Sequence, residues 1–364
     1  MGAILVINPG STSTKLAVFA NHELLAEETI RHKVDEIEQF EGVIDQTAFR
    51  KQLILEFIET YNFADELVAI VGRGGLLKPI PGGTYYVDDA MLEDLLTEKY
   101  NTHASNLGGI LAHEFGQEYH VPAFIVDPVV VDEMMPIARI SGLKGIERRS
   151  VAHVLNQKAV ARKILEENSL TYEDGRVIVA HLGGGISVGA HANGKMIDVV
   201  NGLDGEGAYS PERSGTLPLI ELSKIIIDNE MTLAEVKSLI AGHSGMKSYL
   251  NETDLRNIQE KVDNGDEVAK YYLDGMCYQV AKSIAEMSVT LEGKVDYIIL
   301  TGGASHSKYI LEKINQYVSW MAPVEVYPGE MEMEALYEGA RRVLEGEEEV
   351  RHYADETISR VGVK

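Results

Sequence analysis

The stretch ILVINPGSTSTKLAVF, from Ile4 to Phe19, decides how the first part of this chain folds. An apolar run leads into a loop of Gly, Ser and Thr that ends at Lys15, a composition typical of phosphate-binding loops. A Walker-type loop would have a second glycine directly before the lysine and a helix after it. Here that glycine is missing, and apolar and β-branched residues flank the turn residues Asn21 to Glu23, which predicts strand, turn and strand. We therefore expect an anion-binding turn inside a β-hairpin.

A second stretch, VIVAHLGGGISVGAHANGKMIDVVNG from Val177 to Gly202, has the same order of features. Each stretch predicts a strand, a Gly-rich turn, a strand, an Asn-centred turn and a strand. Within it, GAHANGKM resembles a Walker loop, but Met196 replaces the Mg²⁺-binding hydroxyl and Asn193-Gly194 favours a hairpin turn, so we reject that interpretation. Hairpins with Gly turns are common enough to match by chance. The matched spacing nevertheless favours two domains of one fold.

A third Gly-rich turn, in VDYIILTGGASHSKYILEKI, joins a predicted strand to a predicted helix and suits nucleotide phosphate or ribose. Between the three turns, helical and strand patterns alternate, which indicates an α/β fold with mixed sheets. The tail EMEALYEGARRVLEGEEEVRHYADE also reads as helical. The sequence contains no low-complexity linker, so we place a short hinge near residues 145–150.

Composition limits the possible partners and location of the chain. Its 364 residues carry a net charge of −24, which argues against binding to nucleic acid or to an anionic membrane surface. The one cysteine, Cys277, cannot form an internal disulfide and reads best as a small buried residue, so a reducing cytoplasm is expected. We see no targeting segment and no apolar run near the roughly 20 residues that a membrane helix needs.

Seven motifs in family order, spanning nearly the whole chain, give a specific resemblance to the acetokinase family, within the superfamily of acetate and sugar kinases, actin and heat-shock ATPases. They are INPGSTSTK (7–15), GRGGLLKPIPGGTY (72–85), FIVDPVVVDEM (124–134), AHLGGGISVGAH (180–191), SPERSG (210–215), LTGGASHS (300–307) and PGEMEMEAL (328–336). One departure is Ala208-Tyr209, where the family would lead us to expect Pro-Phe.

The resemblance implies two duplicated actin-like (ribonuclease H-like) domains, each a mixed β-sheet flanked by helices, with an ATP cleft between them. We expect an N-terminal domain over 1–148, a C-terminal nucleotide-binding domain over 149–335, and a C-terminal helix, 336–364, that folds back onto the first domain. It also implies reversible transfer of phosphate from ATP to a short-chain carboxylate with Mg²⁺, and a homodimer or an assembly of dimers.

The expected chemistry needs no general base, because a carboxylate nucleophile is already ionised at neutral pH. Catalysis must then come from positioning and from charge around the phosphoryl group. On the first turn, the matches to the family's phosphate loop are Asn8, Ser11, Ser13 and Lys15. Turn formation alone would also explain these serines.

Four further residues match family positions near the transferring phosphate. Arg73 and Arg213 would hold the substrate carboxylate and the phosphate, although surface ion pairs are an alternative. Asp127, at the end of a strand, would act near Mg²⁺, and an Asx turn before Pro128 is its competitor. His181 would stabilise the phosphate; His103 and His153 also have family matches, but their helical contexts favour structural roles.

The remaining matches concern the nucleotide and the metal. We expect the β-phosphate beside Gly183, Gly184 and Gly185, and the adenosine half beside Gly302, Gly303 and Ser305. Glu332, with Asn8, is our choice for the Mg²⁺ site, and Glu330 and Glu334 compete with it because the motif permits a slip of two residues.

Four hypotheses for function follow. The first is phosphorylation of butyrate or a branched relative such as isobutyrate, and the second is phosphorylation of acetate or propionate. The third, from another class, is an actin-like or chaperone-like ATPase with protein partners, for which the sequence offers no additional domain. The fourth is a sugar kinase, in which Asp127 would deprotonate a hydroxyl.

Overall fold

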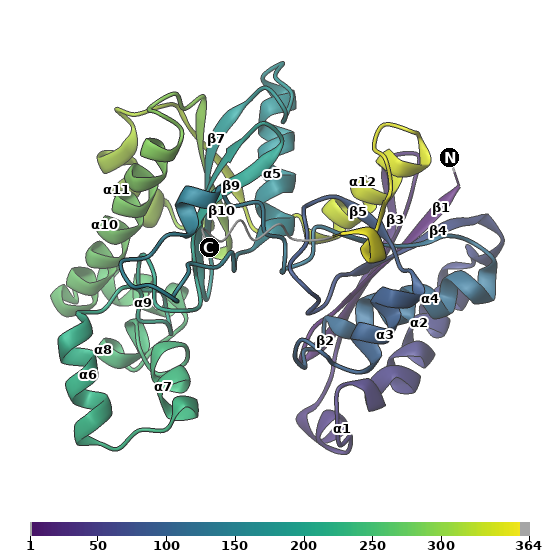
Figure 1. The fold of residues 1–364 in the computed structure, drawn as a ribbon, viewed down its shortest axis with the longest axis horizontal. Coiled ribbons are helices and arrows are strands. Elements are labelled where there is room, and N and C mark those ends of the chain that lie inside the picture. The colour runs from purple at the N-terminus through teal and green to yellow at the C-terminus, as the bar shows by residue number, and fades with distance from the viewer. Residues whose placement is uncertain (1, 357–364) are drawn as a thin grey trace. The chain divides into compact units, whose positions relative to one another are not determined.

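The chain forms two compact α/β units, and the computed structural model describes residues 2–356 (Figure 1). Unit 1 runs to Asp132 and resumes at Met331, whereas unit 2 is the continuous segment from Glu133 to Glu330. The chain therefore passes from one unit to the other twice. No helix within residues 2–356 is both long and apolar enough to cross a membrane.

Unit 1 contains a seven-stranded mixed sheet in the order β12-β5-β6-β4-β1-β2-β3. Its strands are β1 (Ala3–Pro9), β2 (Ser13–Ala20), β3 (Glu23–Arg31), β4 (Leu67–Arg73), β5 (Thr84–Tyr86), β6 (Ala123–Val126) and β12 (Arg351–His352). Its helices are α1 (Val34–Glu38), α2 (Thr47–Tyr61), α3 (Asp89–Leu96), α4 (Asn106–Tyr119) and α12 (Glu332–Leu344).

Helices cover both faces of this sheet, which explains why β1 reads as an unbroken apolar run and is buried along its length. Ile125 packs beside Gly109 of α4, while the next residue, Val126, packs beside Gly339 of α12. Since successive side chains of a strand point to opposite faces, α4 and α12 lie on opposite faces of the sheet. At Gly72 the backbone of β4 meets α4 so closely that a Cβ would lie 2.0 Å from the Gly108 carbonyl oxygen.

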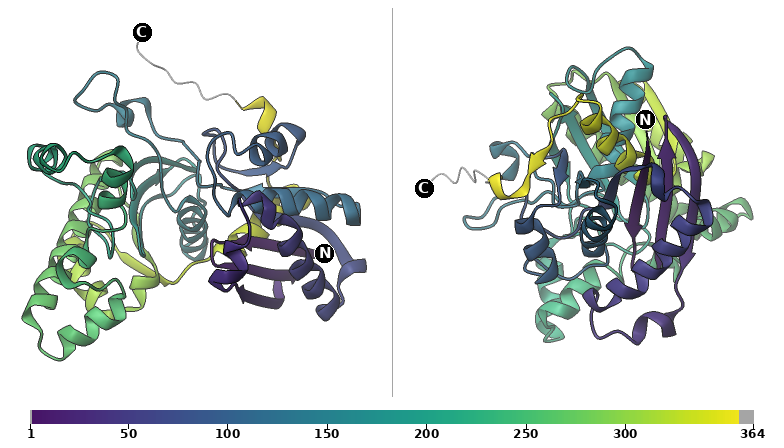
Figure 2. Two further views of the ribbon diagram at one scale, coloured as in Figure 1. Left: turned by 90° about the horizontal axis from the view of Figure 1, so that it is seen from below. Right: turned by 90° about the vertical axis from the view of Figure 1, so that its right-hand side faces the viewer.

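Unit 2 contains a five-stranded sheet in the order β11-β10-β7-β8-β9. Its strands are β7 (Arg176–Leu182), β8 (Ile186–Ala192), β9 (Lys195–Val200), β10 (Tyr297–Gly302) and β11 (Val324–Pro328). Its helices are α5 (Val154–Glu167), α6 (Leu219–Asp228), α7 (Leu233–Ile240), α8 (Met246–Leu250), α9 (Leu255–Asp263), α10 (Glu267–Thr290) and α11 (Lys308–Val318). Helices α6 and α7 lie at one end of this unit, away from its sheet (Figures 1 and 2).

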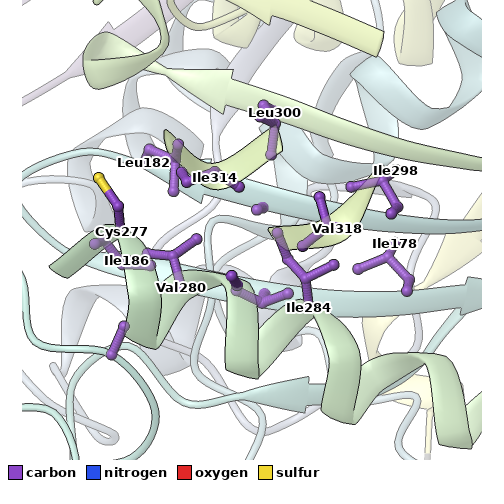
Figure 3. Close-up of a cluster of buried hydrophobic side chains, with 14 of the residues drawn as sticks. Ile178, Leu182, Ile186, Cys277, Val280, Ile284, Ile298, Leu300, Ile314 and Val318 are labelled. Atoms are coloured by element: carbon purple, nitrogen blue, oxygen red, sulfur yellow. The ribbon is translucent and has the colours of Figure 1, made fainter. Parts of the chain in front are cut away.

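The core of unit 2 lies between its sheet and the helices α10 and α11 (Figure 3). Alternate residues of β7, such as Ile178 and Leu182, point into it and meet Val280 and Ile284 of α10 and Ile314 of α11. Cys277 is buried in the same cluster, as its sequence context predicts, and burial raises the pKa of its thiol to about 12.

The predicted duplication is confirmed strand by strand. In unit 1, β1 pairs antiparallel with β2 and parallel with β4, and β2 pairs antiparallel with β3. In unit 2, β7, β8, β10 and β9 take the places of β1, β2, β4 and β3. The turn between β2 and β3 and the turn between β8 and β9 each have two residues with positive φ, Asn21-His22 and Asn193-Gly194. This is the geometry of a tight hairpin.

The division of the chain differs from the sequence-based boundaries. Residues 133–148, which we assigned to the first domain, pair with unit 2: Met135 N–H donates to the Ile197 carbonyl, and Arg148 binds Asp198 and Glu206. The helical reading of the tail is wrong beyond Leu344, because the chain then forms β12 beside β5 and a short 3₁₀ turn. Residues 357–364 of the predicted helix lie outside the described residues.

Candidate functional site

The first Gly-rich turn spans residues 10–12 between β1 and β2. Gly10 N–H donates to the Ser13 carbonyl oxygen at 2.8 Å, which closes the turn. Ser11 is exposed, and Ser13 and Lys15 are half-buried on β2. Among the described residues, no carboxylate pairs with Lys15. The turn therefore presents hydroxyls and a cation, as an anion-binding loop requires.

Arg50, which the sequence analysis did not single out, lies fully buried behind this turn. Its guanidinium donates to the carbonyl oxygens of Gly10 (2.9 Å) and Ser13 (3.1 Å), to the Thr14 hydroxyl (2.9 Å) and to the Gln46 side-chain oxygen (2.8 Å). All of these acceptors are neutral, and burial lowers the pKa of Arg50 to about 10, so the group stays cationic near neutral pH. The sequence contains a signal for this burial, because Arg50 falls on the same face of α2 as the apolar residues Ile54 and Phe57.

Asn8, Arg73 and Glu332 form a cluster in unit 1, which we call the unit 1 triad. Asn8 and Arg73 lie at the carboxyl ends of the neighbouring parallel strands β1 and β4, where active-site groups of α/β proteins gather. Glu332 is the first residue of α12. Its carboxylate accepts from Arg73 Nη2 (3.1 Å), Arg73 Nη1 (3.2 Å) and Asn8 Nδ2 (2.9 Å). The structure thus brings together three residues that the motifs place far apart.

The three glutamates that competed for Mg²⁺ have different surroundings. Glu332 belongs to the unit 1 triad, Glu330 belongs to unit 2 and lies 3.5 Å from His181 Nε2, and Glu334 is exposed on α12. Among residues 2–356, no group of three His, Cys, Asp or Glu side chains is arranged to hold a metal ion. A single carboxylate beside an amide, as at Glu332 and Asn8, fits Mg²⁺, which keeps most of its ligands as water.

Asp127 follows β6 at the same sheet edge as Arg73 and is buried. Its backbone has a φ of +37°, a positive value that is uncommon outside glycine, although Asp tolerates it better than most residues. Asp127 Oδ1 accepts from Gly83 N–H at 2.8 Å, and Asp127 N–H donates to the Gly83 carbonyl oxygen. Asp127 is thus held in place by Gly83, a contact that differs from the Asx turn before Pro128 named as its alternative.

The glycine triplet of unit 2, Gly183 to Gly185, forms the turn between β7 and β8. Arg213 lies against it: a Cβ on Gly185 would stand 2.0 Å from Arg213 Nη1. The same Nη1 donates to the Gly202 carbonyl oxygen at 2.6 Å, and burial lowers the pKa of Arg213. Around Gly184 a Cβ would meet nothing within 4 Å. Only glycine at position 185 leaves room for this guanidinium.

At Ala208-Tyr209, where the family would lead us to expect Pro-Phe, the tyrosine forms hydrogen bonds with α10. The Tyr209 hydroxyl donates to the Tyr272 carbonyl oxygen at 2.5 Å, and Tyr209 N–H donates to the Gln279 side-chain oxygen at 3.2 Å. Tyr209 therefore ties the loop before Arg213 to α10.

His181, in β7, is 1% exposed and stacks face to face on His153, with ring centroids 3.8 Å apart and planes 7° apart. Asn156 lies 2.9 Å from His181 Nδ1, and the site that a Cβ on Gly183 would take lies 3.2 Å from His181 Nε2. His153, set aside in the sequence analysis, thus belongs with His181. His103 belongs to unit 1, where desolvation and then the charge of Arg73 lower its pKa.

The third turn follows β10, and a short 3₁₀ segment, Gly303–His306, separates it from α11. Gly302 has a φ of +89°, and a Cβ there would collide with the backbone of Leu182. Gly303 is open, since a Cβ would meet nothing within 4 Å. The Ser305 hydroxyl is buried and donates to the Gly302 carbonyl oxygen at 2.6 Å, so it shapes the turn.

The fold is that of the acetate kinases. The structure resembles acetate kinase from Porphyromonas gingivalis with a TM-score of 0.76 at 20% identity, covering 94% of this chain and 100% of that one. It resembles a propionate kinase from Francisella tularensis with a TM-score of 0.72 at 18% identity, covering 93% and 99% of the two chains. At these identities the likeness concerns the fold alone.

The amino-acid sequence shows the family of the chain. The sequence model of the acetokinase family matches residues 142–323 of this chain. The chain is 66% identical over 358 residues to a protein of Enterococcus faecalis named as a probable butyrate kinase, covering 98% of this chain and 99% of that protein. The chain therefore belongs to the acetokinase family, as its motifs predicted.

The buried Arg50 gives a prediction about stability. Arg50→Met removes the donors to Gly10, Ser13 and Thr14 and leaves buried acceptors unpaired, so we expect a loss of about 2–4 kcal/mol in the free energy of unfolding. Urea unfolding followed by circular dichroism would measure it. Lys51→Met, at the neighbouring half-buried position whose ammonium pairs with Glu114 and Glu118, is the control and should cost about 1 kcal/mol or less. Equal effects of the two changes would contradict this account of Arg50.

Proposed function

We propose that this protein transfers the γ-phosphoryl group of ATP to a short-chain carboxylate, giving an acyl phosphate and ADP in a reversible reaction. A carboxylate oxygen forms a bond to phosphorus as the bond from phosphorus to the β,γ-bridging oxygen breaks. The carrying observation is the 66% identity, over nearly the full length of both chains, to the probable butyrate kinase. The same relationship supports butyrate, or a branched relative such as isobutyrate, as the acceptor.

In this proposal the residues of the chain supply charge and position and need not remove a proton. The first turn, with Ser11, Ser13 and Lys15, would bind phosphate oxygens. Arg73 would hold the carboxylate. Its pairing with Glu332 supports this role because it shows that a carboxylate fits the guanidinium fork.

Unit 2 would supply the donors to the phosphate groups. Arg213 and His181 would stabilise the transferring phosphoryl group, and their placement beside the glycine triplet supports this. The open surroundings of Gly184 and Gly303 would let parts of the nucleotide approach the protein backbone closely. Gly302 and Ser305 would shape the turn near the adenosine half. Asp127 would act near the metal, from its fixed position at the sheet edge.

Glu332 and Asn8 would hold Mg²⁺ through their side-chain oxygens, and the proximity of the two side chains supports that choice over Glu330 and Glu334. When bound, Mg²⁺ supplies positive charge that neutralises phosphate oxygens during transfer. We also propose a cytoplasmic location, supported by the single, buried cysteine.

The acceptor is tested by trapping acyl phosphates with hydroxylamine across acetate, propionate, butyrate, isobutyrate and valerate. We expect the highest kcat/KM with butyrate or isobutyrate. A strong preference for acetate or propionate would move the assignment to the second hypothesis. ADP release that is independent of any carboxylate would favour an ATPase, and release that depends on a polyol would favour a sugar kinase.

The role of Arg213 is tested by two substitutions that remove it in different ways. Arg213→Ala deletes the guanidinium, and Gly185→Ala drives it away by steric conflict. We expect each to lower kcat by about 100-fold or more, because the positive charge beside the transferring phosphoryl group is lost or displaced. In Arg213→Ala the ADP affinity measured by calorimetry should change only a few-fold. Gly142→Ala, where a Cβ meets nothing, is the control. Unchanged turnover in Arg213→Ala would remove Arg213 from the mechanism.

We further propose that two copies of the chain associate through α6. None of its residues is buried in a single chain, and Leu219, Ile220 and Ile227 are each more than 70% exposed. An apolar patch of this kind on a soluble protein usually marks an interface.

Sedimentation equilibrium should find the wild type as a dimer or an assembly of dimers. Ile220→Glu with Ile227→Glu should shift it toward monomer, since each change places a charge in the apolar patch. Glu221→Lys, an exposed polar position on the same helix, should leave the assembly unchanged. A wild type that sediments as a monomer would contradict the proposal.

A further inference from the structure

A continuous chain of hydrogen bonds runs through the interior of unit 2 to His153. The Tyr172 hydroxyl lies 2.8 Å from His191 Nδ1, and His191 Nε2 lies 3.0 Å from Gln157 Oε1. Gln157 Nε2 lies 2.9 Å from Ser187 Oγ, which lies 2.9 Å from His153 Nδ1. All of these residues except His153 are at most 3% exposed. A polar chain this deep must satisfy each of its members.

The orientation of Gln157 is set by a backbone carbonyl. Gln157 Nε2 lies 3.3 Å from the Ser187 carbonyl oxygen, which can only accept, so the amide NH₂ must face Ser187 and the amide oxygen must face His191. His191 then carries its proton on Nε2, and its Nδ1 accepts from Tyr172. The absence of a side chain at position 189 makes room, because a Cβ on Gly189 would stand 2.4 Å from Gln157 Oε1.

The tautomer of His153 is fixed by the hydrogen bonds of Ser187. Ser187 Oγ accepts from Gln157 Nε2 and, at 3.4 Å, from the backbone N–H of His153. With both lone pairs engaged, the Ser187 hydroxyl has only its proton to offer to His153 Nδ1. Neutral His153 therefore carries its own proton on Nε2.

A second, separate chain fixes His181 in the same way. The Thr301 hydroxyl donates to the Gly329 carbonyl oxygen at 3.1 Å, so it accepts from Asn156 Nδ2 at 3.2 Å. The NH₂ of Asn156 then also faces His181 Nδ1, at 2.9 Å, which makes that nitrogen an acceptor. His181 carries its proton on Nε2, the nitrogen nearest to Gly183 and to Glu330.

We propose that Gln157 and Asn156 are positioning residues that lock His153 and His181 as a stacked pair of neutral Nε2–H tautomers. Both rings then act as N–H donors to an anionic oxygen without giving up or taking a proton. This use of the pair rests on the proposed phosphoryl transfer, whereas the tautomers themselves follow from the two hydrogen-bond chains alone. Two neutral rings at a 3.8 Å centroid distance also avoid the repulsion between two imidazolium ions.

The tautomers are tested by long-range ¹H–¹⁵N NMR on protein labelled with ¹⁵N-histidine, with single His→Gln variants for assignment. In the wild type we expect both rings to show a protonated Nε2 and an unprotonated Nδ1. A Nδ1–H tautomer, an imidazolium or an averaged pattern at either ring near neutral pH would overturn the proposal.

Two isosteric substitutions should each invert one ring. A carboxylate only accepts, so in Gln157→Glu the Ser187 proton turns to the introduced carboxylate, and Ser187 Oγ then accepts from His153 Nδ1–H. In Asn156→Asp, His181 must donate from Nδ1 in its turn. Each variant should change its own ring and leave the other unchanged, because the two chains share no hydrogen bond. Gln117→Glu, exposed on α4, is the control for added charge and should change neither ring.

A buried carboxyl group introduced by Gln157→Glu can stay protonated and donate to Ser187 as the amide does, which would leave His153 unchanged. Ser187→Ala is therefore the second variant, because it removes the serine proton itself. Without the serine proton, His153 should become a mixture of tautomers while the amide spectrum remains that of a folded protein. If neither Gln157→Glu nor Ser187→Ala alters the His153 pattern, the proposal is wrong.

Kinetics separate this proposal from the proposed function. In the hydroxylamine assay, Gln157→Glu and Asn156→Asp should each lower kcat by about 100-fold with little change in the KM for ATP, since an N–H donor is lost from the reacting group. A confirmed tautomer inversion without any effect on kcat would refute the donor role and leave the tautomers standing. Absence of acyl phosphate formation by the wild type would refute the proposed function and leave the NMR result unaffected.

Discussion

A fully buried guanidinium with only neutral acceptors holds the first turn of this protein in shape. Arg50 binds both ends of that turn, at the Gly10 and Ser13 carbonyl oxygens, and no carboxylate within the described residues compensates its charge. Burying a charge costs free energy even when its hydrogen bonds are satisfied. An anion bound at the turn would offset that cost. In unit 2 the corresponding turn also has an arginine against it, because Gly185 makes room for Arg213. Each copy of the fold thus places a cation behind or beside its glycine-rich turn.

The sequence predicts the fold where local pattern and tertiary structure agree. The two hairpins and the helices α2, α4, α5 and α10 follow from the periodicity of apolar residues and from Gly and Asn at the turns. The unit boundary could not be found in this way. Residues 133–148 show no break in composition, and their membership in unit 2 depends on distant contacts such as those of Arg148. The acidic tail reads as helix because Glu and Arg favour helices, but pairing of β12 with β5 overrides that preference.

The candidate site was predictable where a motif carries it and unpredictable where packing does. Asn8, Arg73 and Glu332 come from three separate motifs, and the parallel pairing of β1 with β4 brings the first two together. Ser305 matched its motif equally well, yet its hydroxyl is engaged within the turn. Arg50 and Gln157 belong to no motif. The apolar pattern of α2 indicates that Arg50 is buried, but the groups that surround Arg50 and Gln157 are set by tertiary packing and cannot be read from the order of residues along the chain.

The double passage of the chain between the units constrains the order in which a nascent polypeptide can fold. Unit 2 is continuous, so it is complete once Glu330 has left the ribosome. Unit 1 begins first but lacks α12 until the last part of the chain is made. Until then one face of its sheet stays uncovered, and that face later packs against Leu336, Gly339 and Ala340. The earlier-synthesised unit therefore matures last, and translation that stops short of α12 would release a chain with an open apolar sheet, a substrate for chaperones and proteases.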